Sequence, residues 1–194
     1  MLFYRLALFI HVMGALTLFI AVGLNFVSML RMRQARTTEQ LAEWARVGLL
    51  AGRIIPVAIL FISGGAIYMV TVAWGWQSAW VDVVLATFIG HAVVVQAIEN
   101  PRLGKLHKSA LKAPAGPTPL DLHLLANNGL LWTVDITVTT TTVGMIFLMS
   151  VKPDLVISLV AIGVTLLAGL ALSMPFWQTT RARVRVTQSG RLAS

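Results

Sequence analysis

The stretch that decides the fold is residues 6–30, LALFIHVMGALTLFIAVGLNFVSML. It contains no Asp, Glu, Lys or Arg, and as a helix it would be roughly 38 Å long at about 1.5 Å per residue. The hydrocarbon core of a bilayer is about 30 Å thick, so one such helix can cross it. The apolar run is too long for a cleavable signal peptide, and no convincing cleavage site follows it. We therefore expect a retained first membrane span.

Four further stretches have the length and apolarity of a membrane span. They are residues 54–74, 80–98, 129–150 and 155–177. The whole chain agrees with this interpretation, because 57% of its 194 residues are hydrophobic and only 11% are charged, against about 25% charged in soluble domains. The predicted fold is an all-α, polytopic transmembrane helical bundle of about five spans, forming a single domain over residues 1–194.

The distribution of cations predicts the orientation of the bundle. If the spans alternate strictly, 13 of the 15 Lys and Arg residues fall on one side, in residues 31–53, 99–128 and 178–194. Short loops rich in Lys and Arg stay in the cytoplasm. We therefore predict two cytoplasmic loops, a cytoplasmic tail and an N-terminus outside. The net charge of +8 does not indicate a nucleic-acid partner, because the cations lie in separate loops and form no continuous face.

Both predicted cytoplasmic loops have recognisable local signals. Thr37 and Gln40 have the spacing of a capping box, which predicts a short interfacial helix that continues into the second span. Residues 99–120 contain four prolines, which predict that no continuous helix crosses this segment. These are Pro101, Pro114, Pro117 and Pro119.

His11 is the first candidate functional residue, because ionisable side chains inside membrane spans are costly and often functional. Gly14 and Asn25 share its helical face. Neutral imidazole binds haem iron or copper, and Gly14 would let a flat macrocycle approach. Met69 and Met145 fall at a similar depth, and their thioethers beside an imidazole suit Cu(I). The structural alternative is that His11 bonds a neighbouring helix and Gly14 serves helix packing.

His91 and Asp135 form the second candidate group. Counted from the span centres, they fall at similar depths, so we predict that they pair across facing helices as a proton relay or as a structural hydrogen bond. His11 lies about 10 Å to the outer side of its span centre, so a haem held by both histidines is not expected. Thr139 and Thr142 share the face of Asp135 and predict either a polar path or bonds back to the helix backbone.

The fifth span carries small residues at every fourth position, a pattern that permits close helix approach. They are Ala161, Thr165, Gly169 and Ser173. This ridge is expected to pack either within the chain's own bundle or in a homo-oligomer or larger membrane complex.

Several short motifs resemble small bacterial membrane proteins. They are Leu8-Phe-Ile-His11-Val-Met-Gly14-Ala, Arg53 with Pro56 and Gly64-Gly65, Trp74-Gly-Trp76, and Met149-Ser-Val-Lys152-Pro153. The chain resembles an uncharacterised family of predicted bacterial integral membrane proteins, distantly similar to copper-resistance D proteins and HemJ-type protoporphyrinogen oxidases. The resemblance implies a multi-pass protein of the bacterial cytoplasmic (inner) membrane. It also implies haem b at a first-span histidine, a position that His11 occupies.

Three functional hypotheses follow from the sequence. The first is an inner-membrane protein that binds haem b or another redox cofactor through His11; if it is an enzyme, it is a haem-linked membrane oxidoreductase. The second is a transport protein for copper or another small solute. The third is a cofactor-free accessory or structural membrane subunit. Hydrolysis and acyl transfer are not expected, because no nucleophile has a neighbouring base.

Overall fold

The computed structural model describes the backbone of residues 1–192 and the side chains of residues 1–177. Seven α-helices and two π-helical turns follow one another along the chain. They are α1 (Leu2–Gln34), α2 (Thr38–Met69), η1 (Val70–Trp74), α3 (Ala79–Val94), η2 (Val95–Glu99), α4 (Asn100–Lys112), α5 (Leu120–Ala126), α6 (Gly129–Val151) and α7 (Leu155–Leu192). The predicted all-α fold is confirmed.

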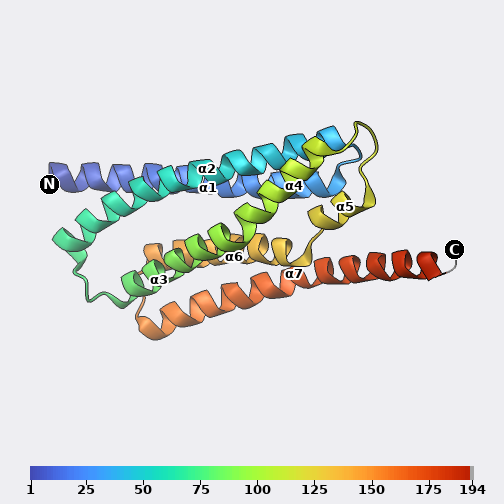
Figure 1. Cartoon of the computed structure of the whole chain (residues 1–194). Helices are drawn as coiled ribbons and strands as arrows, with labels where there is room; N and C mark the ends of the chain where they lie inside the picture. Colours follow the sequence, from blue (N-terminus) through green and yellow to red (C-terminus); the bar gives the residue numbers. More distant parts are fainter. Residues whose placement is uncertain (193–194) are drawn as a thin grey trace.

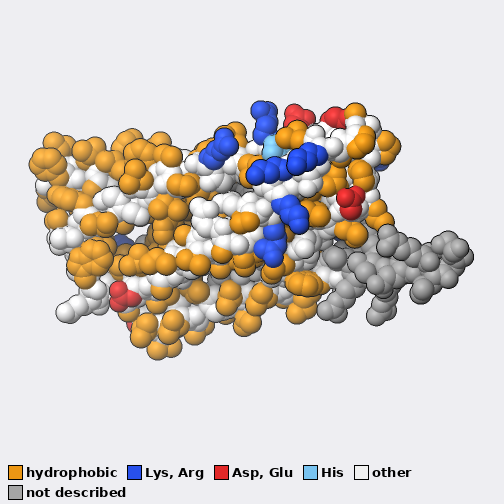
Figure 2. Space-filling view, viewed as in Figure 1, with side chains coloured by type: hydrophobic (Ala, Val, Ile, Leu, Met, Phe, Trp, Pro, Cys, Tyr) orange, Lys and Arg blue, Asp and Glu red, His pale blue; other side chains and the backbone are white. Residues whose placement is uncertain are grey.

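Five helical segments are long and apolar enough to cross a membrane, as the sequence predicts. They are Leu2–Gln34, Thr38–Trp74, Ala79–Lys112, Leu120–Val151 and Leu155–Trp177. Apolar side chains are exposed along all five, for example Phe9, Leu60, Ile89, Val143 and Leu167. Figure 2 shows these apolar side chains over most of one face, while Lys and Arg gather over the half that carries α4. The chain is a multi-pass membrane protein.

The helices form two antiparallel pairs joined by the α3–α4 segment. Figure 1 shows α1 beside α2 and α6 beside α7, with α3 and α4 running obliquely from the second pair to the first. The N-terminus lies at the same end as the turns 75–78 and 152–154, which we call the tryptophan end. The opposite end carries residues 31–53 and 99–128, and we call it the basic end. The orientation of these ends in the membrane remains a prediction.

The first helix pair is held by close backbone contact. A Cβ added to Gly14 would lie 2.7 Å from the backbone nitrogen of Ile62, and one added to Gly65 would lie 2.5 Å from the carbonyl oxygen of Ala7. Ala21, Ala51 and Ala58 are also fully buried. Small side chains therefore bring the two backbones together, which is how helices gain packing energy in a bilayer.

The second pair uses the small-residue ridge of α7. A Cβ added to Gly144 would lie 2.6 Å from Thr165 Oγ1, and one added to Gly169 would lie 2.7 Å from Thr137 Cα. Ser173 is buried, and Ala161 packs against the cluster that contains Met145 and Leu148. The ridge thus lies against α6 of the same chain.

No continuous helix crosses residues 99–120, as predicted, but the loop expected to begin at residue 99 is helical as far as Lys112. Pro101 is within the first turn of α4, and the helix continues to Lys112. Proline is tolerated there because the first residues of a helix need no intrahelical N–H bond, and the preceding π-helical turn shifts the bonding pattern. The remaining three prolines lie in the non-helical connection 113–119, as expected.

At the basic end the two connections are bonded to each other. The amide of Thr38 donates to the carbonyl of Gly116 (3.0 Å), and the amide of Thr118 donates to that of Arg36 (2.9 Å). The buried Thr38 hydroxyl also donates to the carbonyl of Pro114 (3.0 Å). We call this set of bonds the clasp.

The predicted capping box is present beside the clasp. Thr37 Oγ1 accepts from the amide of Gln40 (3.3 Å), and Gln40 Oε1 accepts from the amide of Arg36 (3.1 Å). The short interfacial helix expected here is the first part of α2, which runs on into the second span without a break. The side chains of the predicted tail, residues 178–194, lie outside the described residues.

Candidate functional sites

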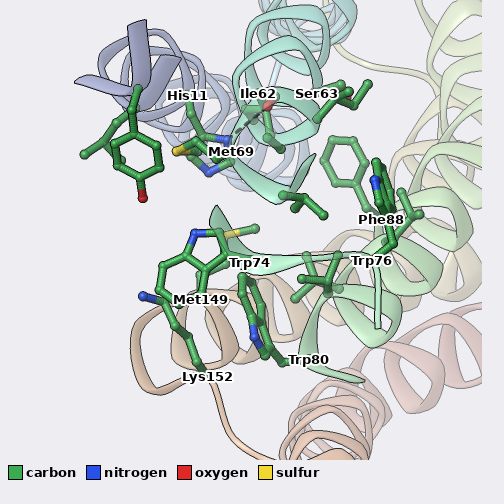
Figure 3. A pocket seen from close by; sticks show the side chains of 18 residues that line it. His11, Ile62, Ser63, Met69, Trp74, Trp76, Trp80, Phe88, Met149 and Lys152 are labelled. Carbon is green, nitrogen blue, oxygen red and sulfur yellow. Dashed lines mark hydrogen bonds between the residues drawn. The ribbon is translucent and has the colours of Figure 1, made fainter. Parts of the chain in front are cut away.

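An apolar cavity lies at the tryptophan end, between the α1–α2 pair and the α3 and α6 helices. It has a volume of about 450 Å³, and we call it the outer pocket. Its lining includes aromatic, thioether and aliphatic groups, with few polar atoms. Figure 3 shows His11 and Met69 on one side, Trp74, Trp80 and Met149 on the other, and Lys152 at the edge. Pockets of this size and character commonly hold organic ligands or cofactors.

His11 is held in one orientation at the wall of this pocket. Its Nδ1 lies 2.9 Å from the backbone oxygen of Ile62 on α2. A carbonyl oxygen can only accept, so Nδ1 carries the proton and the neutral ring leaves Nε2 as a lone-pair acceptor. Among the described residues, no group donates a hydrogen bond to Nε2. The same arrangement, with one nitrogen fixed by a carbonyl and the other free, is typical of histidines that bind metals.

The residues predicted to accompany His11 are only partly found beside it. Met69 lines the outer pocket, but Met145 is buried between α3, α6 and α7 and lines a different cavity. Met149, one turn further along α6, occupies the position that the sequence analysis assigned to Met145. The misassignment is one helical turn, which lies within the error of counting depth from expected span boundaries.

Gly14 and Asn25 are not part of the outer pocket. Gly14 faces Phe61 and Ile62 of α2, so its lack of a side chain serves helix packing. Asn25 lies more than three turns away from His11 along α1 and bonds side chains of α6 and η2. The prediction that these two residues contribute to a cofactor site with His11 is therefore wrong, since a shared helical face does not bring distant turns to one cavity.

One cation lies at the edge of the outer pocket. Lys152 has φ 54°, the left-handed conformation that ends α6. Its Nζ lies 3.7 Å from the centre of the Trp74 indole ring, a cation–π contact. Trp74 in turn meets Trp80 edge to face at 6.0 Å. The pocket thus combines an apolar interior with a positive charge at its rim.

A second, smaller cavity lies deeper in the bundle. It has a volume of about 80 Å³ and is lined on its polar side by His91, Gln96, Asn100 and Thr142. Phe88 lines both this small cavity and the outer pocket. The two histidines that the sequence analysis singled out therefore lie in different cavities, in keeping with the expectation that they do not share a haem.

His91 bonds Thr141, and in the described part of the chain it has no hydrogen bond with Asp135. The Thr141 hydroxyl gives its proton to the carbonyl of Thr137 (2.6 Å), so its oxygen accepts from His91 Nε2 (2.5 Å). The predicted His91–Asp135 pair is not formed, because α6 lies in a different register against α3 than the expected span centres indicate. Asp135 lies opposite Glu99, two helical turns from His91.

Asp135 belongs instead to a buried cluster of three side chains from three helices. Asn25 Nδ2 donates to Asp135 Oδ1 (2.8 Å) and to Glu99 Oε1 (2.6 Å). Asp135 is 3% exposed and Glu99 4% exposed. Neither carboxyl group has an ion-pair partner among the described residues. We call Glu99 and Asp135 the carboxyl pair.

The sequence analysis did not identify Glu99 as a candidate. The available signal is its position one residue beyond an expected span and two residues before Pro101, which disfavours a continuing helix. Recognising that Pro101 fits the first turn of a following helix would have extended the span and placed a second acidic residue inside the membrane.

The threonine run of α6 divides into two kinds of residue. Thr133, Thr140, Thr141 and Thr142 bond back to carbonyls in the preceding turn. Thr137 and Thr139 do not, and their buried hydroxyl oxygens have no hydrogen-bond partner. Thr139 lies one turn from Asp135, so two buried polar atoms without a hydrogen bond, Asp135 Oδ2 and Thr139 Oγ1, follow each other along α6.

The comparisons add no relative to this description. No protein-family model, curated protein or solved structure matches the chain. Function must therefore be argued from the two sites themselves.

Proposed function

We propose that the chain is a small membrane protein that binds a flat, largely apolar redox cofactor in the outer pocket through His11, with haem b as the leading candidate. The observation that carries the proposal is the unpaired Nε2 of His11. An acceptor in an apolar cavity is costly without a partner, and a metal centre supplies one. The proposed location is the bacterial inner membrane, with the tryptophan end outside.

The residues of the outer pocket fit such a group. Its volume of about 450 Å³ and its aromatic and aliphatic lining suit an apolar macrocycle. Lys152 at the rim suits carboxylate groups on the cofactor's edge. When bound, haem iron would supply one-electron chemistry, with its potential set by the axial ligand and the surrounding polarity.

The chain's own contribution is to position and shield the ligand. The Ile62 carbonyl fixes the His11 tautomer, and the contact of Gly65 with Ala7 and His11 fixes the position of α1 against α2. Phe88 closes the inner side of the pocket. These are the features that keep a ligated imidazole in one orientation.

Copper handling is the second candidate, because Met69 and Met149 line the same pocket as His11. Two thioethers and an imidazole are a donor set that favours Cu(I). In this case His11 would have the same role, with the methionines as further ligands. A cofactor-free accessory subunit, alone or in a larger membrane complex, is the third candidate.

The test is an absorption spectrum of the full chain, expressed with sufficient haem and purified in detergent. We expect a Soret band that is lost in His11→Ala and retained in His91→Ala. The second variant is the control, because His91 also lies in a membrane span but bonds Thr141 and lines a different cavity. The second candidate would be supported by a spectrum without a Soret band together with stoichiometric bound copper. In that case the copper should be lost in His11→Ala and reduced in Met69→Leu. If neither haem nor copper is bound, the accessory role remains.

A further inference from the structure

The carboxyl pair is used by none of these functions, and its environment is unusual. Two acidic side chains from α6 and η2 meet inside a membrane bundle, bridged by one amide and without a neighbouring cation. Their accepting oxygens both lie within hydrogen-bond distance of the same nitrogen, Asn25 Nδ2. Two carboxylates this close in a medium of low polarity repel strongly, so they do not both remain ionised.

One carboxyl oxygen of the pair is fully buried without a hydrogen bond. Asp135 Oδ2 is buried and forms no hydrogen bond, although the side chain is 3% exposed. An ionised carboxylate oxygen left unpaired in such a place is costly, whereas a protonated one, or one bonded to a water molecule, is not. The Thr139 hydroxyl oxygen, one turn further along α6, is also buried and unpaired.

We propose that Asn25, Glu99 and Asp135 form a proton-binding site that exchanges protons towards the small cavity. One proton is bound to an oxygen of the pair, with Asp135 Oδ2 as its entry point, and the other carboxyl group stays ionised. Asn25 holds both groups in place through the two hydrogens of its amide. Uptake forms one O–H bond on a carboxyl oxygen, breaks one O–H bond of the hydronium ion that delivers the proton, and changes the charge of the pair from −2 to −1.

The residues around the carboxyl pair determine from which side protons can reach it. Towards the basic end, the next turns of the same three helices carry Met29 and Met32, Leu103 and Leu106, and Leu131 and Trp132. All six are at most 1% exposed and belong to one apolar cluster. This cluster seals the basic side, because an apolar close-packed region carries no hydrogen-bonded chain for a proton.

Towards the tryptophan end, the path is polar. Thr139 and Thr142 follow Asp135 along α6 in this direction, and Thr142 lines the small cavity together with His91 and Gln96. A cavity of about 80 Å³ has room for water, which needs roughly 10–15 Å³ per molecule on this measure. Phe88 is then shared with the outer pocket. Protons therefore exchange from the side of the small cavity.

The charged groups on the neighbouring elements are directed elsewhere. On α1, Arg33 lies over the Trp132 and Phe176 rings, and on α4 Arg102 donates to the carbonyl of Ile98. The α2 cations Arg46 and Arg53 are exposed. His107 on α4 bonds the carbonyl of Ala42, and His91 on α3 bonds Thr141. On the described part of α7, residues 155–177, there is no ionisable side chain. Among the described residues, both hydrogen bonds to the pair come from the amide of Asn25.

Infrared spectroscopy of the full chain in detergent tests the site directly. The chain has seven acidic residues, and the five outside the pair are all exposed. They are Glu39, Glu43, Asp82, Asp121 and Asp154. Acidic side chains in water are ordinarily ionised at pH 7. A protonated-carboxyl C=O band at pH 7 must then come from the pair. We expect this band in the wild type and in the exposed control Asp121→Asn, and its loss in the double variant Glu99→Gln/Asp135→Asn.

A wild-type spectrum without the band would overturn the proposal, because both groups would then be ionised. A band that persists in the double variant would overturn it as well. If the double variant does not fold, labelling wild-type protein with ¹³C at the carboxyl groups of Asp and Glu separately identifies the carrier of the band.

The direction of proton exchange is tested by the rate of hydrogen–deuterium exchange of the band. Exchange should be at least tenfold slower in Thr139→Val and near wild type in Thr137→Val, whose hydroxyl faces Gly169 of α7; equal rates would refute the path through Thr139. This test does not depend on what binds in the outer pocket.

Discussion

Replacing Gly65 with alanine tests the helix contact on which the His11 site depends. The added Cβ would lie 2.5 Å from the Ala7 carbonyl oxygen and 2.8 Å from His11 Cβ. Ordinary carbon–oxygen contacts are about 3.3–3.6 Å, so α1 must shift by about 0.8 Å or more. Because the obstructing atom is helix backbone, no change of side-chain rotamer relieves the overlap. The cost should approach the upper end of the 1–3 kcal/mol typical of overpacking, about 2–3 kcal/mol.

The measurement is thermal unfolding in detergent, followed by tryptophan fluorescence. For a chain of this size about 1 kcal/mol corresponds to about 2–4 °C, so the midpoint should fall by about 4–12 °C. Gly64→Ala is the matched control: it is the adjacent residue of the same helix, and its Cβ meets no atom within 4 Å. Its midpoint should be unchanged or slightly raised, because alanine favours the helix over glycine. Equal midpoints for the two variants would refute the close α1–α2 contact.

Three further predictions concern other parts of the bundle. Gly169→Ala should lower the midpoint, because its Cβ would meet the α6 backbone, whereas Gly163→Ala, with no atom within 4 Å, should not; similar losses in both would contradict the α6–α7 packing. Thr38→Val should lower the midpoint by an amount equivalent to about 1–2 kcal/mol, since it removes a buried donor from the clasp; an unchanged midpoint would show that the bond is not formed. Because the chain has no cysteine, single cysteines at the exposed positions Gln77 and Ala115 can be labelled with an impermeant maleimide. Labelling in intact cells is expected only at position 77, and the reverse result would invert the predicted orientation.

The number and approximate limits of the spans could be predicted because each span carries its own apolar run. This signal is local, since crossing a bilayer requires only length and apolarity. The register between spans could not be predicted in the same way. It depends on where small residues allow contact, as at Gly65 and Gly169, and on the helix continuing past Pro101. As a result the partner predicted for Asp135 is wrong: Asp135 faces Glu99 and not His91.

In the candidate site, too, the local features could be predicted and the contacts between helices could not. His11 could be identified from its residue type and its place in an apolar run. Its partners could not, because Met149 and Lys152 reach the outer pocket through the fold and not through sequence spacing. The surroundings of Trp132 also depend on the fold, since it is fully buried and stacks on Phe176.

The clasp has a mechanical consequence for the opposite end of the molecule. It ties the two connections together at the basic end, while the outer pocket lies between the helix pairs at the far end. Since α1 has 33 residues, it is a lever of roughly 50 Å at about 1.5 Å per residue. A pivot of about 2° at the clasp moves the far tip by about 1.7 Å, on the order of a carbon–carbon bond. A change of about 2° in the angle at the clasp would therefore alter the width of the pocket mouth at the far end of the helices.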